Sequence, residues 1–239
     1  MLFAAGLGTR LKPFTDHHPK ALAEVNGKTL LERNLSYLHA SGISDVVINV
    51  FHFADQIIDK LNALSFPHMQ IHVSHEVGGP FETGGGLAFA ASHFKSSGDP
   101  FVVMNVDILT SLNLNRMMET HLASMPLATL AVSSRESSRQ FLFDEHMMLQ
   151  GWRNNKTGES RWGNANEQHP GVSGFAFSGV HILDPAIFNL MEESGKFSIT
   201  DVYINLSAEH VILGHDHSGD HIIDVGKPEA IAIASQLFN

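Results

Sequence analysis

The feature that most constrains the fold is an alternation of short apolar segments with amphipathic ones between residues 1 and 107. The segments Asp45–Val50 and Phe101–Asn105 have the length and composition of buried strands. Thr29–Ala40, before the first of these strands, and Ala54–Leu64, after it, carry apolar residues at helical spacing. This alternation predicts an α/β fold with a mostly parallel central sheet and helices on both faces.

The rest of the chain continues the pattern less regularly. We predict further strands at Gln70–Ser74, Leu127–Ser133, Gln140–Asp144, Met147–Gly151, Phe175–Leu183 and His221–Val225. We predict further helices from Gly84 to about Phe94, after Asp184-Pro185, and over Thr200–Ser207 and Pro228–Leu237. The polar stretch 154–171 is expected to be an exposed loop. Because no repeat or linker is visible, we expect one domain over residues 1–239.

Composition excludes several classes of protein. The net charge is −10, from 15 basic and 25 acidic residues, which argues against a nucleic-acid partner. An anionic small substrate would need a local cluster of cations, backbone N–H groups or a metal. The chain has no cysteine, so disulfides, thiolate metal sites and cysteine nucleophiles are excluded. No apolar run approaches the roughly 20 residues of a membrane helix. We therefore expect a cytoplasmic monomer or small homo-oligomer without a membrane partner.

The 16 histidines include two groups that are close in sequence. These groups are His68, His72, His75 and His215, His217, His221. A zinc site is conceivable at either, but neither group matches a known zinc motif. We favour the interpretation that they lie at the surface or at strand ends.

A glycine-rich loop, Gly6-Leu7-Gly8-Thr9-Arg10, follows the predicted first strand Leu2–Ala4. Glycines there let the backbone approach a polyphosphate and direct N–H groups at it. The loop matches neither the dinucleotide fingerprint nor the P-loop. Arg10 and Lys20 add positive charge close by, whereas Lys12 is expected to be surface charge. Because ligands bind at the carboxyl ends of parallel strands, the loop and Asp107 should open onto one crevice.

Five segments resemble the motifs of the sugar-1-phosphate nucleotidyltransferases. The first is the loop itself, Ala4–Thr15, continued by Pro19-Lys20-Ala21-Leu22. The others, in the same order as in that family, are Glu82–Gly86, Asn105–Asp107, Phe177–Val180 and Ile223–Pro228. The resemblance implies a three-layer αβα, Rossmann-like fold without a β-helix domain. It also implies a nucleotide-binding half at about 1–125 and a sugar-phosphate half at about 126–239.

The resemblance also implies roles for individual residues. Arg10 and Lys20 would be catalytic, Arg10 at the leaving pyrophosphate and Lys20 between the two phosphates. Asp107 and Asp224 would bind Mg²⁺, although for Asp224 taken alone, without the resemblance, a turn former is the first interpretation. The residues implied for the nucleotide are Ala5, Gly6, Gly8, Thr9, Glu82, Gly84, Gly85 and Asn105. Those implied for the sugar phosphate are Gly179, Trp152, Thr200 and Asp201.

The implied chemistry agrees with elementary physics. Two phosphates repel each other, so fixed cations must bring them together. Carboxylate oxygens suit Mg²⁺, which completes its shell with phosphate oxygens and water. The sugar phosphate attacks directly, so catalysis is mainly positioning and charge stabilisation.

The sequence departs from the family pattern at several positions. Val106 stands where a glycine is usual, and Ile222 and Ile223 stand where an aromatic residue is common. No Glu-Lys-Pro segment follows Asp107, and Gln150–Asn154 is assigned to its place. Trp152 in that stretch either stacks on a sugar or packs in the core. Because the first strand begins abruptly at Met1, we also expect a few residues upstream of this numbering.

Three functional classes remain to be weighed. Within the resemblance, the chain looks most like N-acetylmuramate-1-phosphate uridylyltransferases, which use UTP. Mannose-1-phosphate guanylyltransferase, which uses GTP, is the alternative enzyme. A non-catalytic regulator that binds nucleotide sugars is the second class, and it does not explain intact Arg10, Lys20, Asp107 and Asp224. A nicotinamide oxidoreductase is disfavoured by the incomplete dinucleotide fingerprint.

Overall fold

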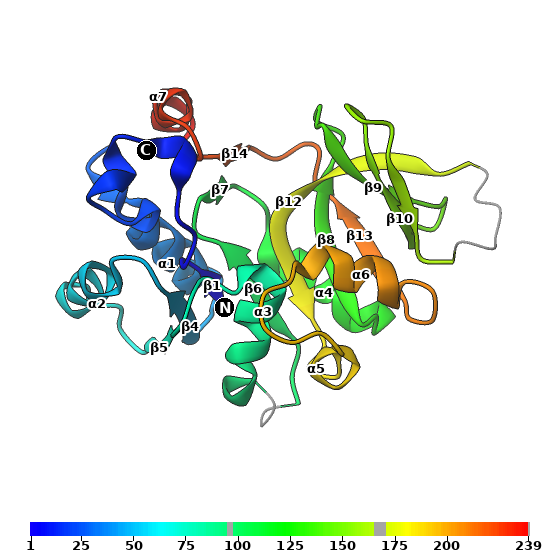
Figure 1. Ribbon diagram of the computed structural model, residues 1–239, viewed down its shortest axis with the longest axis horizontal. Coiled ribbons are helices and arrows are strands. Elements are labelled where there is room, and N and C mark those ends of the chain that lie inside the picture. Colours follow the sequence, from blue (N-terminus) through cyan, green and yellow to red (C-terminus); the bar gives the residue numbers. More distant parts are fainter. Residues whose placement is uncertain (95–97, 165–170, 239) are drawn as a thin grey trace.

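The computed structural model describes residues 1–94, 98–164 and 171–238 and shows an α/β fold (Figure 1). Its main sheet has the strand order β11-β10-β9-β12-β6-β1-β4-β5, with β8 paired to β12 and β13 paired to β8. The strands of the first half are β1 (Leu2–Phe3), β4 (Asp45–Val50), β5 (Gln70–His75) and β6 (Phe101–Asn105). All pairs among these four strands are parallel, which confirms the predicted parallel centre.

The second half extends this sheet mainly by antiparallel pairing. Its strands are β8 (Ala128–Ser133), β9 (Arg139–Phe143), β10 (Leu149–Asn154), β11 (Ser160–Trp162), β12 (Ser173–Leu183) and β13 (Ile212–Asp216). The long strand β12 pairs antiparallel with β6, β8 and β9 and so joins the two halves. Figure 1 shows this division, with the blue and cyan elements around β4 on one side and the green-to-orange strands around β12 on the other.

Helices cover both faces of the sheet, as the alternation of strands and helices predicted. They are α1 (Leu30–Ala40), α2 (Ala54–Ala63), α3 (Glu82–Phe89), α4 (Leu114–Ser124), α5 (Ile187–Leu190) and α6 (Ile199–Leu206). The last helix, α7 (Pro228–Leu237), packs instead in a separate small core with Val25 and Val225. Successive strand side chains point to opposite faces. Leu2 and Ile48 accordingly pack in a core with α1, α2 and α4, whereas Phe3 and Val47 pack in a second core with α3, α5 and α6. The result is a three-layer αβα arrangement.

Two small sheets stand apart from the main one. The hairpin of β2 (Glu24–Val25) and β3 (Lys28–Thr29) turns at Asn26 and Gly27, which both have positive φ. This confirms the turn signal in the sequence. Strands β7 (Ile108–Thr110) and β14 (Ile222–Asp224) pair antiparallel, with Asp224 opposite Ile108. That pairing brings the closing segment of the chain beside the end of β6.

The structure corrects several sequence predictions. Helix α4 and strands β7 and β13 were not predicted, and β11 lies in the stretch 154–171 that was expected to be a loop. Helix α4 was missed because it buries few apolar side chains. Strand β11 was missed because it is defined by its pairing with β10 and not by a local apolar pattern. Residues 165–170 of that stretch lie outside the described residues. Among the helices that the structure describes, none has the length and apolar character needed to cross a membrane.

Candidate active site

A cavity of about 430 Å³ lies at the carboxyl ends of β1 and β6. It is bounded by the glycine-rich loop, by residues 105–107 and by the start of α3. Nine of the residues implicated by the sequence line it: Ala5, Gly6, Gly8, Thr9, Arg10, Lys20, Glu82, Asn105 and Asp107. The expectation that the loop and Asp107 open onto one crevice is therefore confirmed.

Gly8 holds the glycine-rich loop against the segment that carries Lys20. Its φ is +62°, and a Cβ there would lie 2.9 Å from side-chain carbons of both Lys20 and Thr15. The Thr15 hydroxyl donates a hydrogen bond of 2.9 Å to the Gly8 carbonyl. Only glycine fits this combination of backbone conformation and space. Lys12 is different, since it lies at the surface and pairs with Asp16 at 2.8 Å.

Two cations and two carboxylates converge on one side of the cavity. The Lys20 ammonium contacts the Asp107 carboxylate and lies 3.8 Å from Oδ1 of Asp224. Nη2 of Arg10 donates a hydrogen bond to Oδ2 of Asp224 at 3.3 Å. The Lys20 side chain is only 10% exposed, whereas that of Arg10 is 56% exposed. The structure thus brings the four predicted catalytic and metal-binding side chains together.

The closing segment of the chain places Asp224. The Val225 amide donates to the Asp107 carbonyl at 2.8 Å, next to the β7–β14 pairing. A Cβ on Gly226 would lie 2.6 Å from both Nη2 of Arg10 and Oδ1 of Asp224. Asp224 is therefore a member of the charged cluster as well as a strand-end residue.

Gly179 also requires glycine. Its φ is +68°, and a Cβ there would lie 2.9 Å from Nδ2 of Asn105. It sits where the register of β12 against β8 shifts, between Phe177 and His181. The predicted sugar-phosphate residue Gly179 therefore contacts the cavity wall through Asn105.

The three glycines at 84–86, of which Gly84 and Gly85 are predicted to contact the nucleotide, pack closely against neighbouring segments. The amides of Gly84 and Gly85 donate to the Phe197 carbonyl at 3.0 and 3.2 Å. A Cβ on Gly84 would lie 2.4 Å from the Phe197 ring, and one on Gly85 would lie 2.0 Å from the Gly195 carbonyl oxygen. Neither residue lines the cavity. They let α3 approach the loop that precedes α6.

A buried polar chain that the sequence analysis missed links the two walls of the cavity. Oδ1 of Asn49 accepts from the Ala4 amide at 2.7 Å, and its Nδ2 donates to Oε1 of Glu76 at 2.7 Å. Oε2 of Glu76 accepts from the Phe81 amide at 2.9 Å. Both side chains line the cavity, and both residues are almost fully buried. The sequence signal that could have revealed this chain is Asn49, a polar residue near the carboxyl end of a mostly apolar strand.

Trp152, Thr200 and Asp201 do not line the cavity. The Arg161 guanidinium lies 4.5 Å from the centroid of the Trp152 ring and pairs with Asp201 at 2.5 Å. Trp152 is 8% exposed, so of the two alternatives it follows the packing one. The Thr200 amide donates to the Ser198 hydroxyl at the start of α6. These residues form a cluster between β10, β11 and α6.

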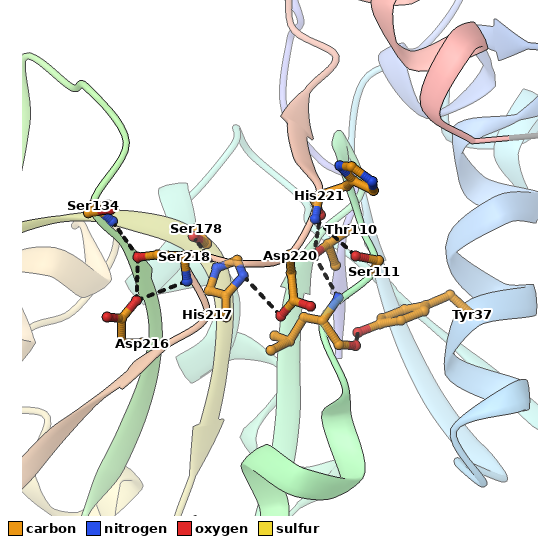
Figure 2. A network of polar contacts seen from close by, with 11 residues as sticks. Tyr37, Thr110, Ser111, Ser134, Ser178, Asp216, His217, Ser218, Asp220 and His221 are labelled. Carbon is orange, nitrogen blue, oxygen red and sulfur yellow. Dashed lines mark hydrogen bonds and ion pairs between the residues drawn. The ribbon is translucent and has the colours of Figure 1, made fainter.

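His217 and His221, two histidines of the group at 215–221, form polar contacts in the segment between β13 and β14 (Figure 2). A ring nitrogen of His217 lies 2.7 Å from the hydroxyl of Ser178, next to Gly179, and the other lies 3.7 Å from Asp220. The His221 amide donates to the Ser111 hydroxyl at 2.9 Å. His217 is buried and directly follows β13, which agrees with the predicted strand-end position, and burial lowers the pKa of His217. The network fixes the segment that leads to Asp224.

The fold and this crevice place the chain among α/β proteins with a ligand-sized cavity at the carboxyl edge of a mostly parallel sheet. More narrowly, the chain belongs to the nucleotidyl transferase family, whose model matches residues 1–141. It is an enzyme of the sugar-1-phosphate nucleotidyltransferase class. Family membership sets aside the oxidoreductase alternative.

Individual relatives have narrower names. The chain is 30% identical over 227 residues to N-acetylmuramate alpha-1-phosphate uridylyltransferase of Neisseria meningitidis serogroup B, covering 92% of this chain and 89% of that protein. It is 24% identical to the mannose-1-phosphate guanylyltransferase catalytic subunit beta of Drosophila melanogaster, covering 100% of this chain and 62% of that protein. The solved structure of HddC from Yersinia pseudotuberculosis complexed with GMP-PN matches with a TM-score of 0.77 at 23% identity, covering 100% and 98% of the two chains.

Proposed function

We propose that this enzyme transfers the uridylyl group of UTP to N-acetylmuramate 1-phosphate and releases pyrophosphate. The observation that carries the proposal is the 30% identity to an N-acetylmuramate 1-phosphate uridylyltransferase over nearly the full length of both chains. The mannose-1-phosphate guanylyltransferase of Drosophila melanogaster is 24% identical and extends well beyond this chain. That relative supports the alternative substrates, GTP and mannose 1-phosphate.

The phosphate groups of both substrates are assigned to the charged side of the cavity. The backbone of Gly6 and Gly8 and the hydroxyl of Thr9 would receive the triphosphate, because they form the loop that follows β1. Arg10 would neutralise the pyrophosphate, and its exposure leaves it free to follow the leaving group. Lys20 is held between two carboxylates and would meet both phosphates where they approach.

The charge of the site fits a divalent cation. Lys20 and Arg10 carry two positive charges, and Asp107 and Asp224 carry two negative ones, so the cluster itself is neutral. A neutral cluster gives little net attraction for a triphosphate beside a second phosphate. Asp107 and Asp224 offer oxygen donors of the kind and number with which Mg²⁺ binds alongside phosphate oxygens. When bound there, Mg²⁺ would neutralise charge on the phosphates.

The reaction needs positioning and no protein nucleophile. A phosphate oxygen of the sugar 1-phosphate attacks the α-phosphorus of UTP, and the bond from that phosphorus to the bridging oxygen of pyrophosphate breaks. Lys20 would hold the attacking phosphate beside the α-phosphate, and Arg10 would hold the departing pyrophosphate. The Asn49–Glu76 chain keeps the two walls of the cavity at a fixed separation, which orients the nucleotide.

The second half is proposed to bind the sugar. Gly179 lies against Asn105 and leaves room beside the charged cluster. We assign Trp152, Thr200 and Asp201, together with Arg161, to shaping the outer part of the sugar pocket, since they tie β10 and β11 to α6. This division gives residues 1–125 to the nucleotide and residues 126–239 to the sugar.

A substrate panel tests the proposal. The purified protein is incubated with Mg²⁺, each of four nucleoside triphosphates and a set of sugar 1-phosphates, and pyrophosphate release is measured. The highest kcat/KM is expected for UTP with N-acetylmuramate 1-phosphate. A higher kcat/KM for GTP with mannose 1-phosphate establishes the alternative. No pyrophosphate release with any pair of substrates contradicts both the proposed and the alternative substrates.

A further inference from the structure

One cation of the sugar-binding half reaches the nucleotide cavity. Lys196 belongs to the loop between α5 and α6, yet it lines the cavity beside Glu82 at the start of α3. Its ammonium lies 3.5 Å from Oε1 of Glu82. The two side chains are 63% and 49% exposed. An ion pair this exposed contributes little to stability, so a ligand can recruit both groups at small cost.

The backbone on both sides of this pair is fixed. The Phe197 amide donates to the Phe81 carbonyl at 3.2 Å, and the Ile199 amide donates to the Thr83 hydroxyl at 3.1 Å. The Phe197 carbonyl in turn accepts from the amides at the start of α3, as described above. Glu82 itself has φ of +60°, an uncommon conformation for a residue with a side chain. The loop therefore presents the donor, Lys196, and the start of α3 presents the acceptor, Glu82, each from a fixed backbone position.

The pair lies on the part of the cavity wall that the phosphate-binding groups leave open. The cavity is lined by the glycine-rich loop with Lys20 and Asp107, and also by Pro80, Glu82 and Thr83. A nucleotide whose phosphates occupy the charged side places its base against the remaining wall. We infer that Glu82 and Lys196 read the edge of the nucleotide base and select UTP over CTP. This inference rests on the proposed function.

The chemistry of the two bases explains the selection. Uracil presents an N3–H donor beside the C4 carbonyl acceptor, so Glu82 accepts from N3–H and Lys196 donates to the carbonyl. Cytosine reverses both groups, with a ring-nitrogen acceptor at N3 and an amino donor at C4. The carboxylate then faces an acceptor and the ammonium faces a donor. A site built for one hydrogen-bonding pattern rejects the other strongly because its own polar groups lose their partners.

The test compares UTP with CTP in matched variants. Equilibrium binding of each nucleotide in the presence of Mg²⁺ is measured by calorimetry, and kcat/KM is measured with the sugar phosphate that turns over. The wild type is expected to prefer UTP by about tenfold or more. Lys196→Met should reduce that ratio by about tenfold, while the same change at Lys28, an exposed residue of β3 that does not line the cavity, should leave it unchanged.

The exchange Glu82→Lys with Lys196→Glu keeps the net charge and the ion pair but reverses donor and acceptor. This double variant should bind CTP in preference to UTP. Its melting temperature should equal that of the wild type. Equal binding of UTP and CTP by the wild type, or an unchanged ratio in the exchanged variant, overturns the inference even where UTP and N-acetylmuramate 1-phosphate are turned over. A preference for UTP that depends on the pair, without turnover of that sugar, supports the inference and contradicts the proposed substrate.

Discussion

The glycine-rich loop after β1 and the cluster around Trp152 occupy the two halves of the same enzyme and are built differently. Gly8 of the loop and Gly226 of the closing segment beside it leave no space for a Cβ, and Lys20 is almost buried between two carboxylates. Around Trp152, longer side chains meet across β10, β11 and α6, and the pair of Arg161 and Asp201 is about half exposed. The end that we propose binds the phosphates is fixed by the backbone, whereas the end that we propose binds the sugar depends on side chains that substitution can change.

This comparison predicts that substitutions at the phosphate end reduce catalysis far more than substitutions elsewhere. The largest effect is expected for Asp107→Asn, which keeps the shape of the side chain but removes its negative charge. If Asp107 binds Mg²⁺, Mg²⁺-dependent pyrophosphate release should fall to background. A metal titration that matches that of the wild type would remove Asp107 from the metal site.

Lys20→Ala should reduce kcat at least about a hundredfold, because it removes the cation that we propose lies between the two phosphates. Circular dichroism and the melting temperature should show that the fold persists. Lys12→Ala is the matched control, since Lys12 pairs with Asp16 at the surface. Normal turnover in the Lys20 variant would contradict its assigned role.

Glu76→Gln should have an intermediate effect, confined to the nucleotide. Both partners of the carboxylate, Nδ2 of Asn49 and the Phe81 amide, are donors, so the new amide group must face one of them. An unpaired buried donor costs about 1–3 kcal/mol. KM for the nucleotide should rise about tenfold while KM for the sugar phosphate stays the same. Equal increases in both KM values would instead indicate a general loss of structure.

The smallest catalytic effect is expected for the core of the second half, where the readout is stability. His181 is fully buried beside the Tyr203 hydroxyl, and burial lowers the pKa of His181 to about 3 from 6.5. Below pH 6.5 the unfolded chain binds a proton at this residue that the folded chain does not. The free energy of unfolding should therefore fall as the pH decreases from 6.5 toward 3. His181→Gln should flatten that slope, and an unchanged slope would assign the acid sensitivity to other groups.

Local sequence patterns predicted much of this molecule. Strands β4 and β6 and helix α7 have the predicted bounds. In β4 and β6 nearly all of the apolar residues of the sequence are buried in the fold. Lys20 and Asp107 were singled out because Lys20 adds positive charge after the glycine-rich loop and Asp107 ends a buried strand, and the family resemblance implied their roles. Strand β11 and the position of Asp224 depend on pairing with distant segments, which no local pattern records.

The glycines at 84–86 illustrate a second limit. A glycine that lets a ligand approach and a glycine that lets another segment approach have the same sequence signature. Here the approaching groups are Phe197, Gly195 and the Glu76 carboxylate. Lys196 was missed for a related reason, since only the contact between its loop and α3 brings it to the cavity.

The most direct test of the account follows the phosphorus atoms. With UTP labelled at the α-phosphate, all of the label should appear in the nucleotide sugar, and with UTP labelled at the γ-phosphate it should appear in pyrophosphate. No label should remain on the protein, because the sugar phosphate attacks the α-phosphorus directly. Label retained on the protein, or released as orthophosphate, would contradict a site that works by bringing two phosphates into line.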